Sequence, residues 1–448
     1  MTTASTSADS PVWTNVEKIV FRIFFIYFFI QAIPVDWKFY QQLFSINWAS
    51  LHYGDIFTLA HYSPQFTGDG FGNWLFIFLL AVIGATAWTI TDKNRTTNYD
   101  RLYYWIRTVV RYRLAIALVA YGLLKVFNLQ SPYPSLSNLN TAYGDFNRWK
   151  LFSLSLGIVP SYEFFLGLVE TTFGLLLLSR KTASIGAFLI LVFTGNVFVS
   201  NIAYDGGQVV YSFYLITLAF FVIAHDLQRL FNLLILQKPT APHKYIPASE
   251  KPWQKYLRIG LKSFAVFFFV ILYGVKTWSG SHKDSYQYPN AKGLAGVSGI
   301  YNVSEYRVNG QALPYSQTDP RRWKDVVFET WNTVSIRSSR PVQIDSSNTD
   351  RLTEADSLRT YELEGSGGRH YYSYDADTAS HALVLHNRNK NYASETLHLT
   401  YAKTDGKQIV LTGTDQNNDS LYVVLDKIDK KYLLKEAAKQ HRGKALKL

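Results

Sequence analysis

The chain has 448 residues, of which 48% are hydrophobic and 16% aromatic, and it carries a formal net charge of +12 with no cysteine. The lack of cysteine excludes disulfides, thiolate nucleophiles, thiolate zinc sites and Cys-ligated iron–sulfur clusters. Long Phe, Leu, Ile and Val runs fill the chain up to about residue 278, and polar, strand-like sequence follows. The basic residues stand mainly at the ends of the hydrophobic runs, which argues against nucleic-acid binding and for a membrane protein.

Seven hydrophobic runs predict membrane spans, because a helix needs about 20 apolar residues to cross a bilayer. The runs are Ile19–Val35, Trp74–Ile90, Ile106–Phe127, Tyr162–Leu178, Ala183–Ser200, Val209–Ala224 and Ile259–Trp278. The third run starts with Arg107, Arg111 and Arg113, which could snorkel to the interface. No signal-peptidase site follows the first run cleanly, so that run is predicted to remain as a permanent span.

The loops between the predicted spans differ in their basic residues. Lys and Arg are frequent between spans two and three, four and five, and six and seven, whereas the Asn201–Gln208 loop has none. Cytoplasmic loops of membrane proteins collect Lys and Arg. This pattern predicts a cytoplasmic N-terminus and an extracytoplasmic C-terminal part.

Short strand-like runs alternate with turn signals after Trp278. They include "PVQID", "RTYELEG" and "HLTYAKTDGKQIVLTG", the last a hairpin signal around Asp405-Gly406. Eight or so short strands in about 150 residues predict an all-β, lipocalin-like barrel or sandwich. Such a barrel can hold a ligand or be filled by its own side chains, and the sequence leaves both alternatives open.

These patterns together predict an α-helical polytopic membrane bundle joined to an all-β domain. The predicted parts are a polar tail (1–16), spans one and two (17–103), a four-helix unit (104–236), a cytoplasmic linker (237–258), the last span (259–278), a tether (279–293), the β domain (294–435) and a basic tail (436–448). Four histidines of the β domain, His370, His381, His386 and His398, lack the spacing of a metal site, so no metal is predicted.

Glu170 is the unusual residue of the membrane part, because it interrupts an apolar run. A charge at mid-bilayer is costly and such residues usually face a bundle interior or a wet cavity. Counted from Ser161 at 1.5 Å per residue, Glu170 lies about 13 Å deep, and Asn196 of the next span lies about 8 Å deep from its own outer end. Glu170 is therefore the candidate proton acceptor or donor, although a neutral acid that holds helices together is the alternative.

Other polar residues are predicted to share the outer side of the membrane with Glu170 and to form a cavity open to the outside. Each has a plainer alternative role: Lys125 as a snorkelling anchor, Tyr211 as an interface aromatic, and Asp205 as part of a tight turn. The candidate ligand-binding residues are Asn196, Lys125, Tyr211, Asn201, Tyr204, Asp205 and His61.

The stretch "GLVETTFGLLLLSRK", with Gly167, Glu170 and Gly174 to Leu177, resembles the most recognisable element of the DoxX-like family of small bacterial membrane proteins. The stretch "YGLLKVFNLQSP" and the later Asn196 fit the same resemblance, which covers about residues 104–236. The loop "HYSPQFTGDGFGNWL", which holds His61, is similar to a loop of larger members with extra N-terminal spans and a β-rich C-terminal domain.

The resemblance implies a multi-pass protein of the bacterial inner membrane with a periplasmic β domain. One member of the family is the membrane subunit of a thiosulfate:quinone oxidoreductase, and others are linked to redox complexes. A quinone is therefore an implied ligand rather than one that the residues require, and a membrane or periplasmic redox partner is implied with it.

Three functions follow as hypotheses. The first is a quinone-linked redox subunit, in which Glu170 handles a proton while Asn196 and Tyr211 position the ligand. The second is a non-catalytic anchor whose β domain binds a partner protein or a lipid. The third is a small-molecule transporter, which the lack of inverted-repeat signs disfavours.

Overall fold

The computed structural model describes residues 13–92, 96, 98–240, 252–284, 287–346, 356–404 and 406–438. The chain divides into two compact units, one of residues 1–126 and 165–280 and the other of residues 127–164 and 281–448. Several predicted features lie outside the described residues: residues 1–12 of the polar tail, 241–251 of the linker, Asp405 of the hairpin turn and 439–448 of the basic tail.

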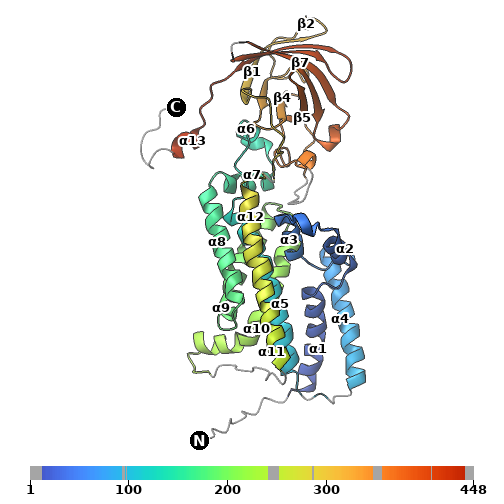
Figure 1. The fold of residues 1–448 in the computed structure, drawn as a ribbon, viewed down its shortest axis with the longest axis vertical. Helices are drawn as coiled ribbons and strands as arrows, with labels where there is room; N and C mark the ends of the chain where they lie inside the picture. Colours follow the sequence, from blue (N-terminus) through green and yellow to red (C-terminus); the bar gives the residue numbers. More distant parts are fainter. Residues whose placement is uncertain are drawn as a thin grey trace. The chain divides into compact units, whose positions relative to one another are not determined.

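The first unit is a bundle of helices. Its helices are α1 (Asn15–Ala32), α2 (Trp37–Ser45), α3 (Tyr53–Ala60), α4 (Phe71–Asp92), α5 (Asp100–Val126), α8 (Pro160–Leu177, whose first turn belongs to the second unit), α9 (Ala183–Ala203), α10 (Val209–Leu234), α11 (Pro252–Val266) and α12 (Tyr273–Ser281). A π-helical stretch, Phe267–Leu272, joins α11 to α12 into one long helical rod (Figure 1). Helix α1 begins at a capping box, in which Thr14 and Glu17 satisfy each other's backbone N–H groups.

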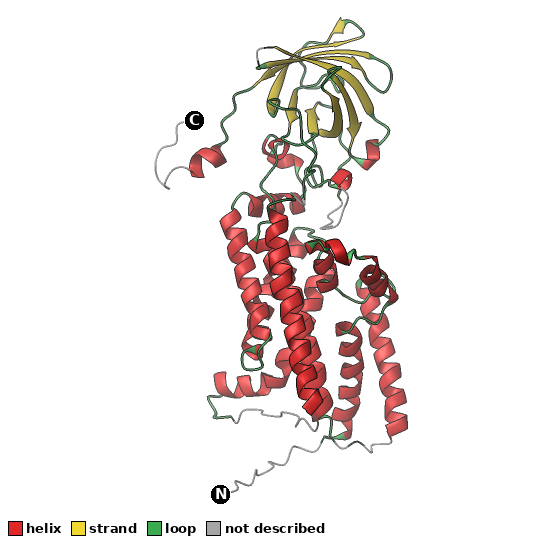
Figure 2. Ribbon diagram, in the orientation of Figure 1, coloured by secondary structure: helices red, strands yellow, loops and turns green. Residues whose placement is uncertain are grey.

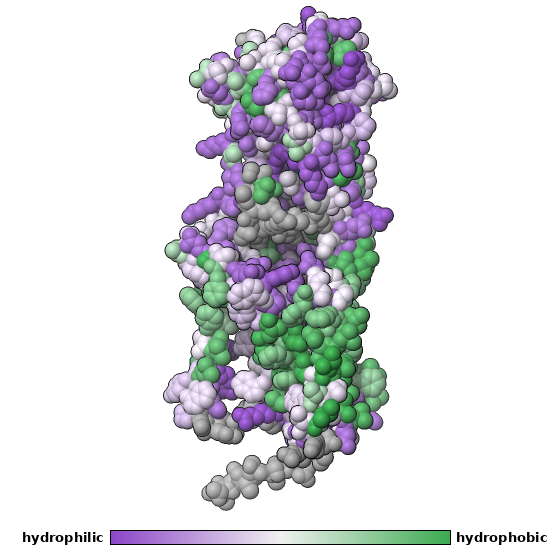
Figure 3. Space-filling view, turned by 90° about the vertical axis from the view of Figure 1, so that its right-hand side faces the viewer, coloured by the Kyte–Doolittle hydropathy of each residue, from purple (hydrophilic) through white to green (hydrophobic). Residues whose placement is uncertain are grey.

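The outer faces of the long helices are apolar. Phe24, Leu79, Val192 and Phe220 are exposed on four different helices, and Figure 3 shows hydrophobic residues gathered over this part of the chain. Exposed apolar surface of this extent is what a helix in contact with lipid requires. The first unit therefore has the surface of a membrane bundle.

Five helical segments of the described chain are long and apolar enough to cross a membrane, and a sixth is added if α7 and α8, bent by 94°, count as one span. These segments cover six of the seven predicted runs. The remaining predicted span corresponds to α5, a helix of 27 residues whose arginines lower its hydropathy. Helix α5 nevertheless packs against α1, α3 and α10 inside the bundle.

The second unit contains a closed antiparallel barrel (Figure 2). Its strands are β1 (Gly299–Val308), β2 (Gln311–Ala312), β3 (Asp325–Phe328), β4 (Thr333–Arg337), β5 (His370–Asp377), β6 (Ala382–Asn387), β7 (Thr396–Thr404), β8 (Gln408–Thr414) and β9 (Ser420–Lys427). Strands β1 and β3 to β9 pair in series, and β1 pairs back with β9 to close the ring, while β2 adds only to the end of β1.

The interior of the barrel is filled by its own side chains. Alternate residues of β7, Leu397, Leu399 and Tyr401, are buried in one hydrophobic core with residues of the other strands. Tyr301 of β1 and Leu425 of β9 lie in the same core. Of the two alternatives that the sequence leaves open, the structure therefore shows the filled barrel.

Two of the strand-like runs are not strands. "PVQID" has no regular structure, and "RTYELEG" forms turns in which Tyr361 and Glu362 are buried. The reason is that these turns pack against the long α5–α8 connection, residues 127–164, which belongs to the second unit. This connection contains α6 (Leu136–Leu139) and α7 (Arg148–Gly157).

Candidate functional site

The carboxylate of Glu170 forms an ion pair with the ammonium group of Lys125. Glu170 lies on α8 and Lys125 lies near the end of α5, and their side chains are 7% and 13% exposed. The two candidate residues are 45 positions apart in the chain, so helix packing alone brings them together. The structure therefore gives Glu170 a cationic partner, Lys125, which the sequence did not identify.

Glycines set the distance between α5 and α8. A Cβ atom at Gly122 of α5 would lie 2.3 Å from Thr171 Oγ1 and 2.9 Å from the carbonyl oxygen of Gly167. A Cβ atom at Gly174 would lie 3.1 Å from the carbonyl oxygen of Ala115. The two backbones therefore approach closely, as small residues permit in membrane helices, and this contact holds Lys125 beside Glu170.

Three rings pack next to the ion pair. The ring of His61 lies 3.9 Å from that of Tyr211 and 5.4 Å from that of Tyr121, measured between centroids. The ammonium group of Lys125 lies 5.9 Å from the Tyr121 ring, which connects the ring cluster to the pair. His61 and Tyr211, predicted separately from two distant segments, are therefore neighbours.

Two polar atoms of this ring cluster are buried without a hydrogen bond. They are the hydroxyl oxygen of Tyr211 and the Nε2 atom of His61. Burial, together with the positive charge of Arg113, lowers the pKa of His61 to about 3. His61 is therefore neutral at ordinary pH and can either donate or accept one hydrogen bond through Nε2, depending on its tautomer.

Arg113 was not predicted as a site residue, yet it organises this region. Its guanidinium donates to the carbonyl oxygens of Ala60, at 2.7 Å, and of Tyr62. These carbonyls belong to the C-terminal end of α3, where a cation is favourable. Arg113 is the arginine that lies farthest along α5, which was the available signal, but the sequence does not show which carbonyls it meets.

The other candidate residues lie apart from the ion pair. Asn196 is exposed on the outer face of α9. Asn201 accepts from the backbone N–H of Gln208 at 3.3 Å and donates to the carbonyl oxygen of Val197 at 2.9 Å, so it shapes the α9–α10 turn. Tyr204 and Asp205 are exposed in that turn, where Asp205 has a left-handed backbone with φ of 55°. The structure thus unites Glu170, Lys125, Tyr211 and His61 only.

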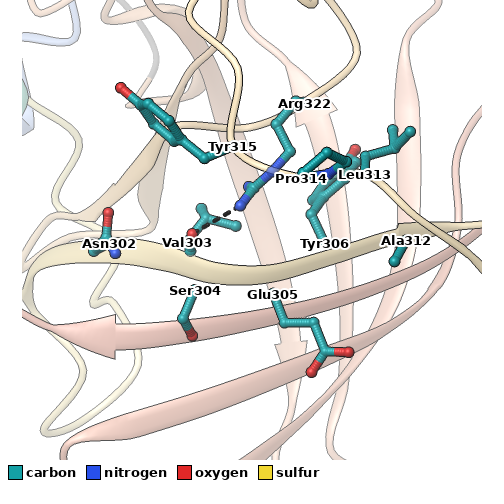
Figure 4. A pocket seen from close by; sticks show the side chains of 10 residues that line it. All are labelled: Asn302, Val303, Ser304, Glu305, Tyr306, Ala312, Leu313, Pro314, Tyr315 and Arg322. Atoms are coloured by element: carbon teal, nitrogen blue, oxygen red, sulfur yellow. Dashed lines mark hydrogen bonds between the residues drawn. The ribbon is translucent and has the colours of Figure 1, made fainter.

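The barrel unit has a small hollow beside β1, with a volume of about 400 Å³ (Figure 4). Arg322 lies over it and donates to the carbonyl oxygen of Val303 at 3.0 Å, while Ser304 and Glu305 point to the opposite side of the strand. Tyr306 packs within 5.4 Å of the guanidinium. The two terminal nitrogens of this guanidinium already donate to the backbone carbonyls of Trp323 and Val303, although its Nε atom is buried without a hydrogen bond.

The four barrel histidines lie in different surroundings. His370 is buried on β5, where Arg340 Nη2 lies 3.2 Å from its Nδ1 atom, and burial lowers the pKa of His370 to about 4. His381 lies in the β5–β6 turn, and His386 and His398 lie on neighbouring strands. Among the described residues, no three His, Asp or Glu side chains are placed together to hold a metal ion.

Comparison with known proteins leaves the chain without a match. No protein-family model, no curated protein and no solved structure matches it. The functional argument therefore depends on the geometry of the residues.

Proposed function

We propose that the chain is a DoxX-like protein of the bacterial inner membrane, with seven spans, a cytoplasmic N-terminus and a periplasmic β domain, that serves a quinone-linked redox reaction. The observation that carries this proposal is the buried Lys125–Glu170 pair beside the unpartnered polar atoms of His61 and Tyr211. A buried ion pair is a poor way to stabilise a protein, because apolar residues of similar size often do as well or better. Its presence in a helix pair therefore favours a chemical role.

The charge balance of the pair suggests what that role is. An isolated charge is very costly in a low-dielectric interior, so the site favours states in which its net charge is zero. An anionic group that approaches Lys125 would make the site negative, and protonation of Glu170 would restore neutrality. The pair is thus suited to bind an anionic group and a proton together.

A quinone head group becomes anionic and takes up protons when it is reduced, so it matches such a site. Each quinone takes up two electrons and two protons to become a quinol, and negative charge develops on its oxygens as the electrons arrive. In the proposed site Lys125 faces that charge, Glu170 takes up a proton as the charge develops and passes it to a ring oxygen, water supplies the second proton, and Tyr211 and His61 hydrogen-bond the ring oxygens. The chain has no cysteine for an iron–sulfur cluster, so an electron-donor protein is proposed as the partner.

Quinone binding by the purified full chain tests the proposal. Menaquinone and ubiquinone analogues are titrated into detergent-solubilised protein and into the variants Glu170→Gln, Lys125→Met and Tyr211→Phe. We expect binding in the wild type and a loss of about tenfold or more in Lys125→Met, because one charge-assisted hydrogen bond is removed. Asn196→Ala is the matched control, since Asn196 is exposed on α9, and it should bind as the wild type does.

Infrared difference spectroscopy gives an independent readout of Glu170. Partial reduction of the quinone in the reconstituted protein should raise a protonated carboxyl band that Glu170→Gln lacks, and the band should disappear when the quinol forms. Absence of both quinone binding and this band would contradict the proposal.

The anchor function is the second candidate, and the filled barrel favours it over a ligand-carrying barrel. With the interior occupied by Tyr301, Leu399 and their neighbours, only the outer surface of the domain is available to a partner. Removal of residues 282–448 should then abolish function while membrane insertion persists. Complementation of a deletion strain by the truncated bundle would exclude this candidate.

A further inference from the structure

A large cleft opens in the helical unit between the first half of α5, the α8–α9 turn and α11. It encloses about 1160 Å³, which exceeds the volume of about 300–1,000 Å³ that is usual for small-molecule pockets. The residues that line it include Leu178 to Lys181 from the turn and Trp253 to Phe269 from α11 and the π-helical stretch. The cleft is distinct from the Lys125–Glu170 pair, since neither residue lines it.

The lining is cationic and apolar, and it contains no carboxylate. Eight of the lining residues are Lys or Arg, and none is Asp or Glu. The cations on α11 are Lys255, Arg258 and Lys262, and the residues that follow are the apolar Phe264, Phe268 and Phe269. Up to Lys262 the α11 lining therefore mixes cations with apolar residues such as Leu257, and beyond Lys262 it is wholly apolar.

Arg111 is the buried cation of this lining that lacks a hydrogen-bond acceptor among the described residues. It is only 6% exposed, and its Nε atom is buried without a hydrogen bond. Its guanidinium lies 5.4 Å from the ring of the adjacent Tyr112, and within the part of the chain that the structure describes it has neither a carboxylate nor a hydrogen-bond acceptor. A buried guanidinium with five donors and no acceptor is costly unless a ligand supplies one.

The two neighbouring arginines of α5 show that this is not a general feature of the helix. Arg107 pairs with Asp226 at 2.8 Å and donates to Ser184 at 3.2 Å. Arg113 donates to the carbonyl oxygens at the end of α3. Of these three arginines only Arg111 combines burial, a place in the cleft lining and the lack of an acceptor.

We infer that the cleft binds one anionic phospholipid, with its phosphate on the Arg111 guanidinium and its acyl chains along the aromatic part of α11 and the π-helical stretch. A phosphate supplies the planar, two-oxygen acceptor that a guanidinium matches. The surrounding cations at Arg258, Lys262 and Arg180 favour a lipid with net negative charge over a zwitterionic one. The apolar part of the lining favours a lipid over a free phosphate, because a free phosphate has no apolar group to pack against it.

Native mass spectrometry of the full chain tests the inference. Protein in detergent micelles is supplied with equal amounts of phosphatidylglycerol and phosphatidylcholine, and the lipid retained after activation is counted. We expect one phosphatidylglycerol per chain in the wild type and at least about a tenfold lower retention in Arg111→Gln, because a charge-assisted contact is lost. Lys181→Gln is the matched control, since Lys181 is exposed in the same lining, and should change retention by less than about threefold.

Three results would overturn the inference. They are equal retention of the two lipids by the wild type, retention by Arg111→Gln at the wild-type level, and equal losses in Arg111→Gln and Lys181→Gln. An arm with inorganic phosphate distinguishes the source of the anion: phosphate that binds as tightly as the lipid and displaces it would show a free-anion site and would also overturn the inference.

Two further variants keep the test decisive if Arg111→Gln does not fold. Arg111→Lys retains the charge but not the planar fork, and should retain lipid more weakly than the wild type and more strongly than a neutral variant. Ile116→Trp fills part of the cleft wall and should displace the acyl chains without changing any charge. Wild-type retention in Ile116→Trp would show that the lipid lies elsewhere and would contradict the inference.

Discussion

The helical unit and the barrel unit both bury charged side chains, but within the described chain Arg111 of the helical unit lacks the carboxylate partner that Arg369 and Arg388 of the barrel unit have. In the barrel unit the buried Arg369 donates to Ser335 at 2.8 Å and pairs with Asp325 at 2.7 Å, and Arg388 pairs with Glu362. In the helical unit Arg111 has no such acceptor among the described residues, and the Tyr211 hydroxyl is buried without a partner. These two barrel arginines each have a carboxylate partner and Arg111 has none in the part of the chain that the structure describes, although both units also hold buried polar atoms without a hydrogen bond, such as Arg388 Nη2 in the barrel unit.

The α5–α8 connection supplies hydrogen-bond partners to several buried polar groups of the barrel unit. Glu329 of the barrel accepts from the backbone N–H of Ser137 at 2.7 Å and from that of Leu136 at 3.1 Å, at the start of α6. Asn147 donates its backbone N–H to the carbonyl oxygen of Gly365 at 2.8 Å. Backbone groups of the connection thus supply partners that the barrel alone lacks, as buried polar groups require.

The largest expected effect is on the helical unit, through the variant Glu170→Ala. It leaves the Lys125 ammonium group buried and unpaired, and we expect it to lower the free energy of unfolding by about 3–5 kcal/mol. The double variant Lys125→Leu/Glu170→Leu removes both charges and should unfold near the wild-type value. Unfolding in mixed micelles of a mild detergent and sodium dodecyl sulfate, followed by helical circular dichroism, measures both.

A small effect of Glu170→Ala alone would mean that the pair is hydrated and weak. A double variant as unstable as the single one would mean that the two residues act separately rather than as a pair. Either result would contradict the interpretation of Lys125 and Glu170 as a tightly coupled buried pair.

The sequence predicts much of the fold, because hydrophobic runs and strand alternation are local signals. It predicts the positions of the long helices, the β character of the C-terminal part and Glu170 as the unusual residue. It does not predict that Lys125 is the partner of Glu170, because the pairing depends on the contact of Gly122 with Gly167 across two helices. The sequence also does not predict that Asn196 is exposed, because the depth of a residue along a helix does not specify which face of the helix it occupies.

The α5–α8 connection shows a second limit. In the sequence it is only the stretch between the third and fourth predicted spans, but Asn138 donates to the carbonyl oxygen of Glu362, 224 positions away, at 2.9 Å. The run "RTYELEG" has the composition of a strand, yet Tyr361 meets Ser153 and Lys150 of α7 instead of a neighbouring strand. Such contacts join side chains to distant backbone and leave no periodic pattern in the sequence.

The next effect concerns the barrel unit and pH. Burial, followed by the negative charge of Glu362, raises the pKa of Glu329 to about 7. A carboxyl group with a raised folded pKa contributes stability that is complete below its unfolded pKa of about 4.3 and is lost as pH rises through about 7. We expect the barrel to lose on the order of 3 kcal/mol over that interval.

The variant Glu329→Gln isolates this titration, because an amide keeps one acceptor oxygen for Ser137 and does not ionise. Thermal unfolding of the full chain, followed by the circular-dichroism signal of the sheet between pH 4.5 and 7.5, should give a shallower decline in the variant. An unchanged slope would show that another group causes the pH dependence and that the polar network tolerates the Glu329 charge.

A smaller effect is expected at the glycine contact of α5 and α8. A Cβ atom at Gly122 would lie 2.7 Å from the backbone nitrogen of Thr171, so Gly122→Ala must push the helices apart. Overpacking of this kind costs about 1–3 kcal/mol, and it should weaken the Lys125–Glu170 pair as well. Gly195→Ala is the control: a Cβ atom there meets nothing within 4 Å, so the higher helix propensity of alanine should leave stability unchanged or slightly raised.

The smallest expected effect compares Arg107, which has protein partners, with Arg111, which has no acceptor among the described residues. Arg107→Met removes the Arg107 guanidinium from Asp226 and should destabilise the bundle by about 1–3 kcal/mol, because the partly buried carboxylate keeps only its contacts with Ser184 and His225. Arg111→Met removes a guanidinium without a protein acceptor and, in detergent free of anionic lipid, should change stability by less than about 0.5 kcal/mol or even raise it. The two substitutions lie four positions apart on one helix and both replace arginine with methionine, so the changes in helix propensity and side-chain volume are matched. Equal losses of stability in the same mixed-micelle assay would show that Arg111 is held by the protein as firmly as Arg107.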